Sequence, residues 1–353
     1  QSCKLYRDMN AVAASDIAMT AVAASETAMA AVVSNATALN ALVTSQVALN
    51  AVAASETAMA AVIGNVTALN AVVTSQLAMN AVAASETAMT AVIANTAAFN
   101  TVVTSHVAMN AVASSYVAVA AVYESAVAVE AVKANETAWA TLTGASSAVM
   151  GKAAAKLAGL NPADYADMTA VAASSTAMAA VIANATALNA VVSSSTAMAA
   201  IIANSTALNA VVSSSAAMSA VAASQTAMTA VASSQTAMTA VAASSTAMAA
   251  IAASSTALSA IAASTTALDA IYAKKKRMSG ASASLSGKFI ILQISNDNAF
   301  DTSRYGYATL SDGSKPKWDS YKDKYAYFKQ YKKIATYMKN DTDSDDWIDY
   351  FQC

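Results

Sequence analysis

Apolar and polar positions follow a fixed ten-residue pattern along most of the chain. From Ala11 the decads read AVAASDIAMT, AVAASETAMA and AVVSNATALN, and the consensus A-V-x-x-[SN]-x-T-A-[ML]-x continues to about Ala140 and again from Ala170 to about Ala273. Such a period is typical of repeat proteins, in which each unit buries its apolar positions against its neighbours. We therefore expect an extended array over most of the chain.

The spacing within a decad favours helix. The apolar residues occupy positions one, two, eight and nine, so across a decad boundary they fall at i, i+1, i+3 and i+4, which is one face of a helix. Alanine dominates, and Gly64 is the only glycine in the first array, which also favours helix. We expect Val12, Met19 and their equivalents to form an apolar seam, with the alanines at positions one and eight allowing close helix packing.

The period itself is compatible with more than one fold. Ten residues in three turns is about 3.33 residues per turn, tighter than a relaxed helix. Either long helices supercoil strongly, or the helix breaks near each Ser or Asn, since both are good N-caps. We predict a mainly α repeat protein: a long, alanine-rich, coiled-coil-like fibre with a small C-terminal antiparallel β module.

The alternative is a β-type or mixed solenoid for the repeats. A three-sided solenoid with one decad per side explains a longer period of about thirty residues, which is visible in the first array because AVAASETAM recurs at 21, 51 and 81. It does not explain the second array, where neighbouring decads alternate with a period of about twenty before they become uniform.

Changes in composition divide the chain into six segments. These are an N-terminal lead (1–10), a first decapeptide array (11–140), a joint rich in glycine (141–169), a second array (170–273), a linker (274–287) and a C-terminal module (288–353). The last segment contains FIILQIS, YGYATLS and DWIDYF, which are β-branched and aromatic segments with near-alternation, separated by polar turns, as in a small β module. The repeat phase slips by one residue across the joint.

Charge is low and unevenly placed. The net charge is −2, so nucleic acid is not an expected partner. No Lys or Arg lies between Arg7 and Lys133, or between Lys156 and Lys274. No run of about eighteen apolar residues is available to insert into a membrane.

Such a chain stays soluble if Ser, Thr and Asn cover it, or if copies bury one another. A lone helix with this seam would expose it, so we expect a homo-oligomer. Three copies are the commonest arrangement in long protein fibres, which makes a trimer the expected number.

Residues for catalysis are scarce. His106 is the only histidine, and it occupies the variable sixth position of a decad, where an exposed side chain is the expected role. Cys3 and Cys353 lie at opposite ends of the chain, so no cluster of His and Cys can bind a metal. We predict no catalytic residues, no cofactor and no enzymatic activity.

One acidic segment resembles the beginning of a calcium-binding loop, with carboxylates at Asp341, Asp343 and Asp345. An EF-hand needs Gly and Glu where this segment has Asp346 and Gln352, so a solvated acidic turn is the preferred interpretation, with Ca²⁺ as the alternative.

The C-terminal module is rich in aromatic residues, which suit both a core and a contact surface. At least half of them must be core in a module of this size. The candidates for a recognition surface are Tyr305, Tyr307, Trp318, Tyr321, Tyr327 and Trp347. The basic run from Lys274 to Arg277 is expected to stabilise the C-terminus of a helix, with a partner-binding patch as the alternative.

Strings such as AVAASSTAMAAV, NAVVSSSTAMAAI and SQTAMTAVASSQTAMTAV resemble the decapeptide arrays of tail-fibre and other virion fibre proteins of large tailed bacteriophages. The resemblance covers both arrays and implies an extracellular, virion-attached, self-associating fibre. Its implied partners are other virion proteins and, through a distal module, a host-surface glycan or protein. No functional residues of that family match, because the likeness lies in the repeats.

Two other functions stay open at this point. One is a bacterial surface or matrix adhesin, and the other is a glycan-degrading fibre tip. Because the chain begins at Gln1, we expect a processed chain or part of a larger one.

Overall fold

The computed structural model describes residues 8–353 except 273, 280–282, 296–304, 311–312, 316, 320–332, 341–346 and 353. At 288, 293–295, 305–306, 317–319, 333 and 340 it describes the backbone alone. The chain divides into two compact units, 1–197 and 198–353. Each unit is described by itself.

The first array consists of short helices, one per decad. They are α1 (Met9–Ala13), α2 (Asp16–Ala23), α3 (Glu26–Val33), α4 (Ala36–Val43), α5 (Gln46–Ala53), α6 (Glu56–Ile63), α7 (Val66–Thr74), α8 (Gln76–Ala84), α9 (Glu86–Ala94), α10 (Thr96–Thr104), α11 (His106–Ala113), α12 (Tyr116–Glu124), α13 (Ala126–Lys133) and α14 (Glu136–Thr143).

The joint and the second array continue in the same manner. The elements are α15 (Ser147–Leu157), the 3₁₀ helix η2 (Pro162–Asp164), α16 (Met168–Ala173), α17 (Ser175–Ala183), α18 (Ala185–Ser193), α19 (Ser195–Ala203), α20 (Ser205–Ser213), α21 (Ser215–Ala223), α22 (Gln225–Ala232), α23 (Gln235–Ala243), α24 (Ser245–Ala253), α25 (Ser255–Ala263) and α26 (Thr265–Tyr272).

The helices of the two arrays begin at the Ser or Asn of their decads, except α1 and α16, which Asp8 and Asp167 cap. At Ser55 the backbone is extended (φ −114°, ψ 118°), which ends the preceding helical path, and the Ser55 hydroxyl caps α6 by accepting a hydrogen bond from the Ala58 N–H at 3.2 Å. At Asn65 the side-chain carbonyl does the same for Ala68 at 3.0 Å. Successive helices are bent by 94° to 106° in the eight pairs measured. The cap residue of each decad is therefore also a corner.

The prediction of long, coiled-coil-like helices is not confirmed: helix is correct, but in both arrays it breaks at every decad. The physical reason is the ten-residue period, which a continuous helix could keep only by strong supercoiling. Breaking the helix at each corner lets every decad turn the same face inward. Within the described residues no single helix is long and apolar enough to cross a membrane, although eight bent pairs reach that length and composition together.

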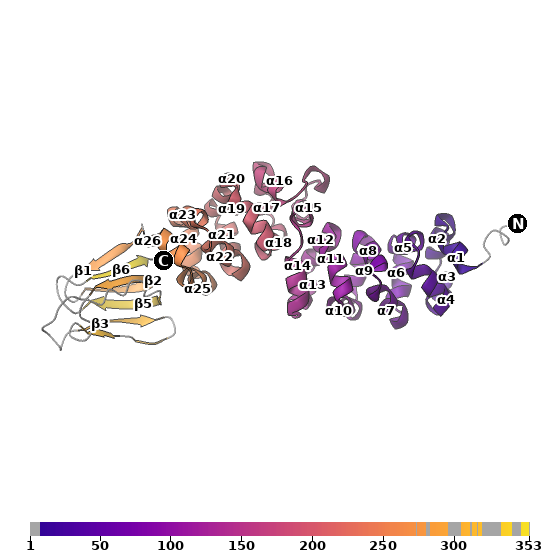
Figure 1. Cartoon of the computed structure of the whole chain (residues 1–353), viewed down its shortest axis with the longest axis horizontal. Coiled ribbons are helices and arrows are strands. Elements are labelled where there is room, and N and C mark those ends of the chain that lie inside the picture. Colours follow the sequence, from indigo (N-terminus) through magenta and orange to yellow (C-terminus); the bar gives the residue numbers. More distant parts are fainter. Residues whose placement is uncertain are drawn as a thin grey trace. The chain divides into compact units, whose positions relative to one another are not determined.

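Each helix stacks on the helix that lies three places earlier in the chain. Three decads therefore make one coil of a three-sided helical solenoid (Figure 1). In the first array α2, α5, α8, α11 and α14 form one stack, α3, α6, α9 and α12 the second, and α1, α4, α7, α10 and α13 the third. In the second unit α20, α23 and α26 stack, as do α21 with α24 and α22 with α25. The interior is filled by positions two, eight and nine, as the expected seam required: Ala58, Met59 and Val62 are each exposed by 1% or less.

At the joint one stack of the first unit continues. Helix α15 packs between α12 and α18, and Lys156 of α15 forms an ion pair with Glu86 of α9 at 3.0 Å. The cap of α15 is Ser146, eleven residues after the cap Asn135, and the cap of α17 is Ser174, 28 residues further on. The 39 residues from Asn135 to Ser174 are one short of four decads, which is the slip in phase. Gly144 lies before this corner, where a Cβ atom would approach the Ala140 carbonyl oxygen to 2.9 Å.

The C-terminal module is an antiparallel sheet with strand order β1-β6-β2-β5-β3-β4, and it confirms the predicted β module. Its strands are β1 (Lys276–Ser279), β2 (Ala283–Ser295), β3 (Tyr305–Leu310), β4 (Lys317–Asp319), β5 (Lys333–Asn340) and β6 (Trp347–Gln352). Two of them begin inside the segment 274–287 that the sequence indicated as a linker.

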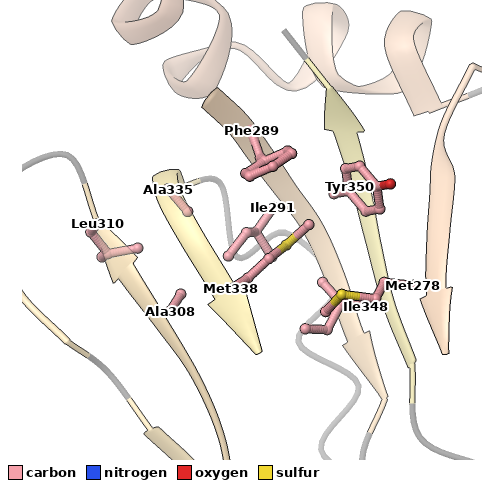
Figure 2. Close-up of a cluster of buried hydrophobic side chains, with 9 residues drawn as sticks. All are labelled: Met278, Phe289, Ile291, Ala308, Leu310, Ala335, Met338, Ile348 and Tyr350. Atoms are coloured by element: carbon pink, nitrogen blue, oxygen red, sulfur yellow. The ribbon is translucent and has the colours of Figure 1, made fainter. Parts of the chain in front are cut away.

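One face of this sheet carries a buried apolar cluster (Figure 2). Its members come from five strands: Met278, Phe289, Ile291, Ala308, Leu310, Ala335, Met338, Ile348 and Tyr350. Phe289 and Tyr350 meet edge to face, with ring centroids 5.4 Å apart. Tyr350 is therefore one of the tyrosines that serve as core.

Candidate functional site

The predicted aromatic recognition surface is only partly brought together. Tyr307 of β3 is half-buried, and its ring lies 5.6 Å from that of Tyr337 on β5. Because neighbouring residues of a strand point to opposite faces, Tyr307 lies on the face opposite its buried neighbour Ala308. Of the six predicted residues, Tyr307 is thus the one whose side chain the structure describes on this side of the sheet, and its partner Tyr337 was not among them.

Trp347 belongs to a different group. It lies on β6, which β2 and β5 separate from β3 in the strand order. Tyr305 and Trp318 lie in β3 and β4 where the backbone alone is described, and Tyr321 and Tyr327 lie outside the described residues. The recognition role of all six residues stays a prediction.

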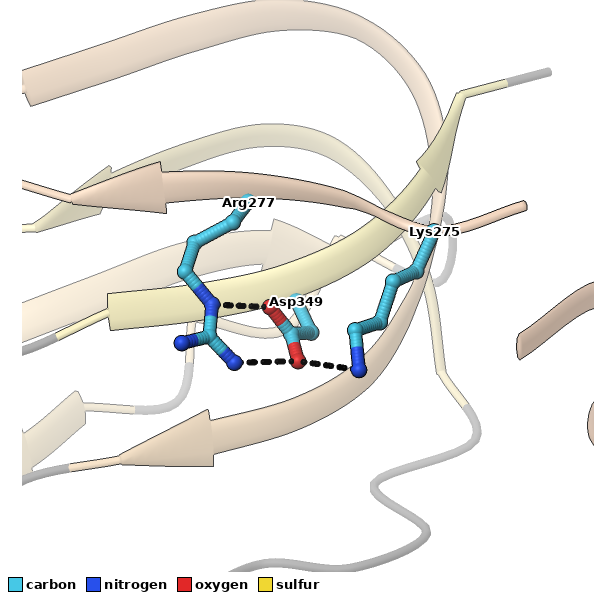
Figure 3. Close-up of polar contacts among 3 residues, drawn as sticks. All are labelled: Lys275, Arg277 and Asp349. Carbon is cyan, nitrogen blue, oxygen red and sulfur yellow. Dashed lines mark hydrogen bonds and ion pairs between the residues drawn. The ribbon is translucent and has the colours of Figure 1, made fainter. Parts of the chain in front are cut away.

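Trp347 packs against a buried ion-pair network at the edge of the sheet. The Arg277 guanidinium lies 3.6 Å from the Trp347 ring centroid and donates two hydrogen bonds to Asp349, at 2.7 and 2.9 Å. The Asp349 carboxylate is fully buried and also pairs with Lys275 Nζ at 3.4 Å (Figure 3). A buried carboxylate held by two cations is satisfied, so this network joins β1 to β6.

The same network reaches the last helix of the second array. Lys275 Nζ lies 3.8 Å from the centroid of the Tyr272 ring, and the hydrogen bond that the Lys275 ammonium donates to Tyr272, followed by the charge of Asp349, raises the pKa of Lys275. Lys275 follows the end of α26, as expected for cations near a helix C-terminus, whereas Lys276 and Arg277 belong to β1. The basic run thus connects the array to the sheet.

The remaining sequence-derived candidates form no catalytic or metal centre in the described part of the chain. His106 is exposed at the start of α11, as predicted, and lines a cavity of about 70 Å³ together with Thr104, Asn135, Thr137 and Thr141 among others. Asp341, Asp343 and Asp345 lie outside the described residues, so calcium binding there stays a prediction. No group of three or more His, Cys, Asp or Glu that could bind a metal occurs among the described residues.

The solenoid creates a surface that the sequence did not disclose. Residues thirty apart in the first array lie on the same side, one coil above another. We define side A as the outward face of α2, α5, α8 and α11. The seventh decad position on this side is aliphatic in four successive coils: Ile17, Val47, Leu77 and Val107.

Amides accompany this aliphatic column. Gln46 donates a hydrogen bond to Asn50 Oδ1 at 2.7 Å, and Gln76 donates one to Asn80 Oδ1 at 2.8 Å. The four amide side chains are exposed. Side A therefore presents regularly spaced aliphatic and amide groups, which is the chemistry of a contact surface and not of a catalytic site.

No protein-family model matches the chain, and no curated protein matches its sequence.

Proposed function

We propose that the chain is a non-enzymatic structural fibre of a phage virion, a tail fibre or a similar appendage. In this proposal the arrays are a stalk, and the stalk presents or connects the C-terminal sheet. The fibre lies outside the cell on the virion, and its partners are other virion proteins and further copies of itself.

The observation that supports a stalk best is the identical attachment of one coil to the next. The Ser55 hydroxyl, which caps α6, also donates to the carbonyl of Ala23 at 2.6 Å, 32 residues earlier. Ser105 and Ser115 make the same bond to Val73 and Ala83, and Ser244 makes it to Val212 in the second unit. Because each coil needs only its neighbours, coils can be added without a change of fold, which suits a spacer of variable length.

The burial of the seam changes the reason for self-association. A lone continuous helix would expose its Met and Val residues, but the solenoid encloses them within one chain, as the full burial of Met59 shows. Association of copies therefore has to come from the outward surface.

Electron microscopy tests the stalk. Purified full-length chains should be elongated particles, and gold-labelled antibodies against the chain should decorate an external appendage of phage particles. Compact particles, or labelling of a bacterial surface or matrix in place of a virion, would exclude the proposed role and favour an adhesin.

Host attachment is the proposed role of the sheet module, with the Tyr307–Tyr337 pair as its contact surface. The full chain should bind cells of the host, and Tyr307→Ala should weaken that binding while Tyr350→Phe, in the core, should not. A chain that turns over host glycans in the same assay would show a glycan-degrading tip.

A further inference from the structure

Two different periods are superimposed in the first array. The inward positions repeat every ten residues: Ala58, Ala68 and Ala78 are all fully buried at the same decad position. The outward positions repeat every thirty, as Glu26, Glu56 and Glu86 illustrate. Since thirty residues make one coil, each side of the solenoid carries its own column of outward residues.

The column on side A is the apolar one. Ile17 is 81% exposed and Leu77 37% exposed, while Val47 and Val107 are half-buried. These positions lie on the outward face in four successive coils, so the side chains form a line with one aliphatic group per coil. Elsewhere in the first array exposed aliphatic side chains occur less regularly.

The other two sides differ in chemistry. Side B, the outward face of α3, α6 and α9, carries the carboxylates of Glu26, Glu56 and Glu86 at helix N-termini, with threonine at the following position. Side C, the outward face of α4, α7, α10 and α13, has Thr37, Thr67 and Ala97 where side A has its column. Its exposed aliphatic side chains, Val66 at position six and Val127 at position seven, do not form a continuous column, although α4, α7 and α10 are also free of charge.

The second array has no such column either. Its equivalent position is Thr or Ala in every decad. The aliphatic column is therefore a property of one side of one array, and the fold does not require it.

Side A is also free of charge over its central coils. Helices α5, α8 and α11 contain no Asp, Glu, Lys or Arg. Two copies that meet through side A bring no like charges together, whereas two copies that meet through side B would bring glutamates into contact. The exposed Gln and Asn side chains keep donor and acceptor capacity for contacts between copies.

We propose that side A of the first array binds side A of a second copy of this chain. A column with one aliphatic group per coil fits a partner whose apolar groups are also one coil apart along its whole length. A second copy of the chain has the same distance between its aliphatic groups because it has the same coils. In a two-fold, self-complementary contact each coil adds an equivalent contribution, so the affinity grows with the length of the array. The pairing rests on the proposed self-associating stalk and specifies the surface that mediates it.

The test uses the full chain and sedimentation velocity over a range of concentrations. The variant is Val47→Thr with Leu77→Thr and Val107→Thr, because threonine is the residue that this position carries on the other sides. The matched control is Thr37→Ser with Thr67→Ser on side C, which changes the same decad position without adding or removing a column of aliphatic groups. Far-UV circular dichroism verifies that the helices are retained.

We expect the unmodified chain to form dimers, the triple variant to raise the dissociation constant at least tenfold, and the control to behave as the unmodified chain. A chain that stays monomeric, a triple variant that associates normally, or a trimer would each overturn the two-fold pairing through side A. A monomeric chain that labels a virion appendage in electron microscopy would overturn this pairing and leave the fibre role standing.

Discussion

The hydroxyl of Ser55 and the carbonyl of Ala23 are joined by a hydrogen bond of 2.6 Å across 32 residues of sequence. The same hydroxyl accepts the Ala58 N–H, so one side chain both starts a helix and fastens it to the coil below. A hydroxyl can do both because it has one donor and two acceptor lone pairs. At Ser55, and at the other serine corners that make this bond, the cap residue thus joins local and long-range structure.

Substitution of this residue should reveal both bonds. Ser55→Ala removes the cap, which costs about 1 kcal/mol, and the bond between coils, which costs about 1 kcal/mol more. We expect a loss of about 2 kcal/mol in local stability, measured as faster amide hydrogen exchange at Ala58 and in the facing end of α2.

Ser55→Asn is the control for this prediction. Asparagine caps α7 at the equivalent Asn65 position, so the cap should survive while the hydroxyl is lost. A variant with Asn should fall between the unmodified chain and the Ala variant. If the Ala and Asn variants exchange equally fast, the bond to Ala23 contributes no stability beyond the cap.

Much of this fold follows from the decad. The sequence predicted helix, the inward positions of Val12 and Met19, and the capping role of Ser and Asn, and it located the β segments. It did not favour the solenoid, because only the first array has a period of thirty. The structure shows why that objection fails: the buried positions need only the ten-residue period, and thirty is a period of the outward residues, which the fold leaves free to vary.

The candidate sites were less predictable. Residues such as Val47 and Leu77 lie on one side only because successive coils stack on each other. A helical wheel drawn for one continuous helix would place them on different faces. The partners Arg277 and Asp349 lie 72 residues apart in different strands, and no local pattern relates them. The period of a sequence predicts whether each position is buried or exposed, but it does not predict which residues distant in sequence lie next to that position.

Truncation of a core methionine should destabilise its coil. Met59 is 1% exposed in α6, and Met59→Ala should cost about 3 kcal/mol because it leaves a cavity. Thr57→Ala, at a half-buried position on the outward face of the same helix, should cost much less, about 0.5 kcal/mol. Hydrogen exchange should show the loss in α6 and in its stacked neighbours α3 and α9, and equal effects of the two variants would contradict the inward assignment of Met59.

The Asp349 network should hold β1 in place. Asp349→Asn removes the charge that Arg277 and Lys275 share, and we expect a loss of about 3 kcal/mol because Asp349 is fully buried. Exchange of the β1 amides should accelerate more than that of β5. Lys276→Ala, whose side chain bonds to the exposed Gln352, is the control and should have little effect. Unchanged protection of β1 in the Asn variant would show that strand pairing alone retains it.

Tyr123 should make the first unit sensitive to alkali. Its hydroxyl is buried without a hydrogen-bond partner in the described structure, and burial raises its pKa from 10.0 to about 12. Between these values the unfolded chain releases the phenolic proton and the folded chain keeps it, so stability is complete below pH 10 and falls by about 1.4 kcal/mol per pH unit up to pH 12.

Tyr123→Phe removes the group responsible for this sensitivity. The variant should lose part of the decline in stability above pH 10, and at neutral pH it should equal or exceed the unmodified chain by up to about 1 kcal/mol, because an unsatisfied hydroxyl no longer has to be buried. Tyr116→Phe, which removes a phenol hydroxyl from the half-buried start of the same helix, is the control, and the decline due to Tyr123 should persist in it. Urea unfolding from pH 8 to pH 11.5 measures both effects. A phenylalanine variant less stable than the unmodified chain at pH 8 would show that a water molecule or a protein group satisfies the Tyr123 hydroxyl.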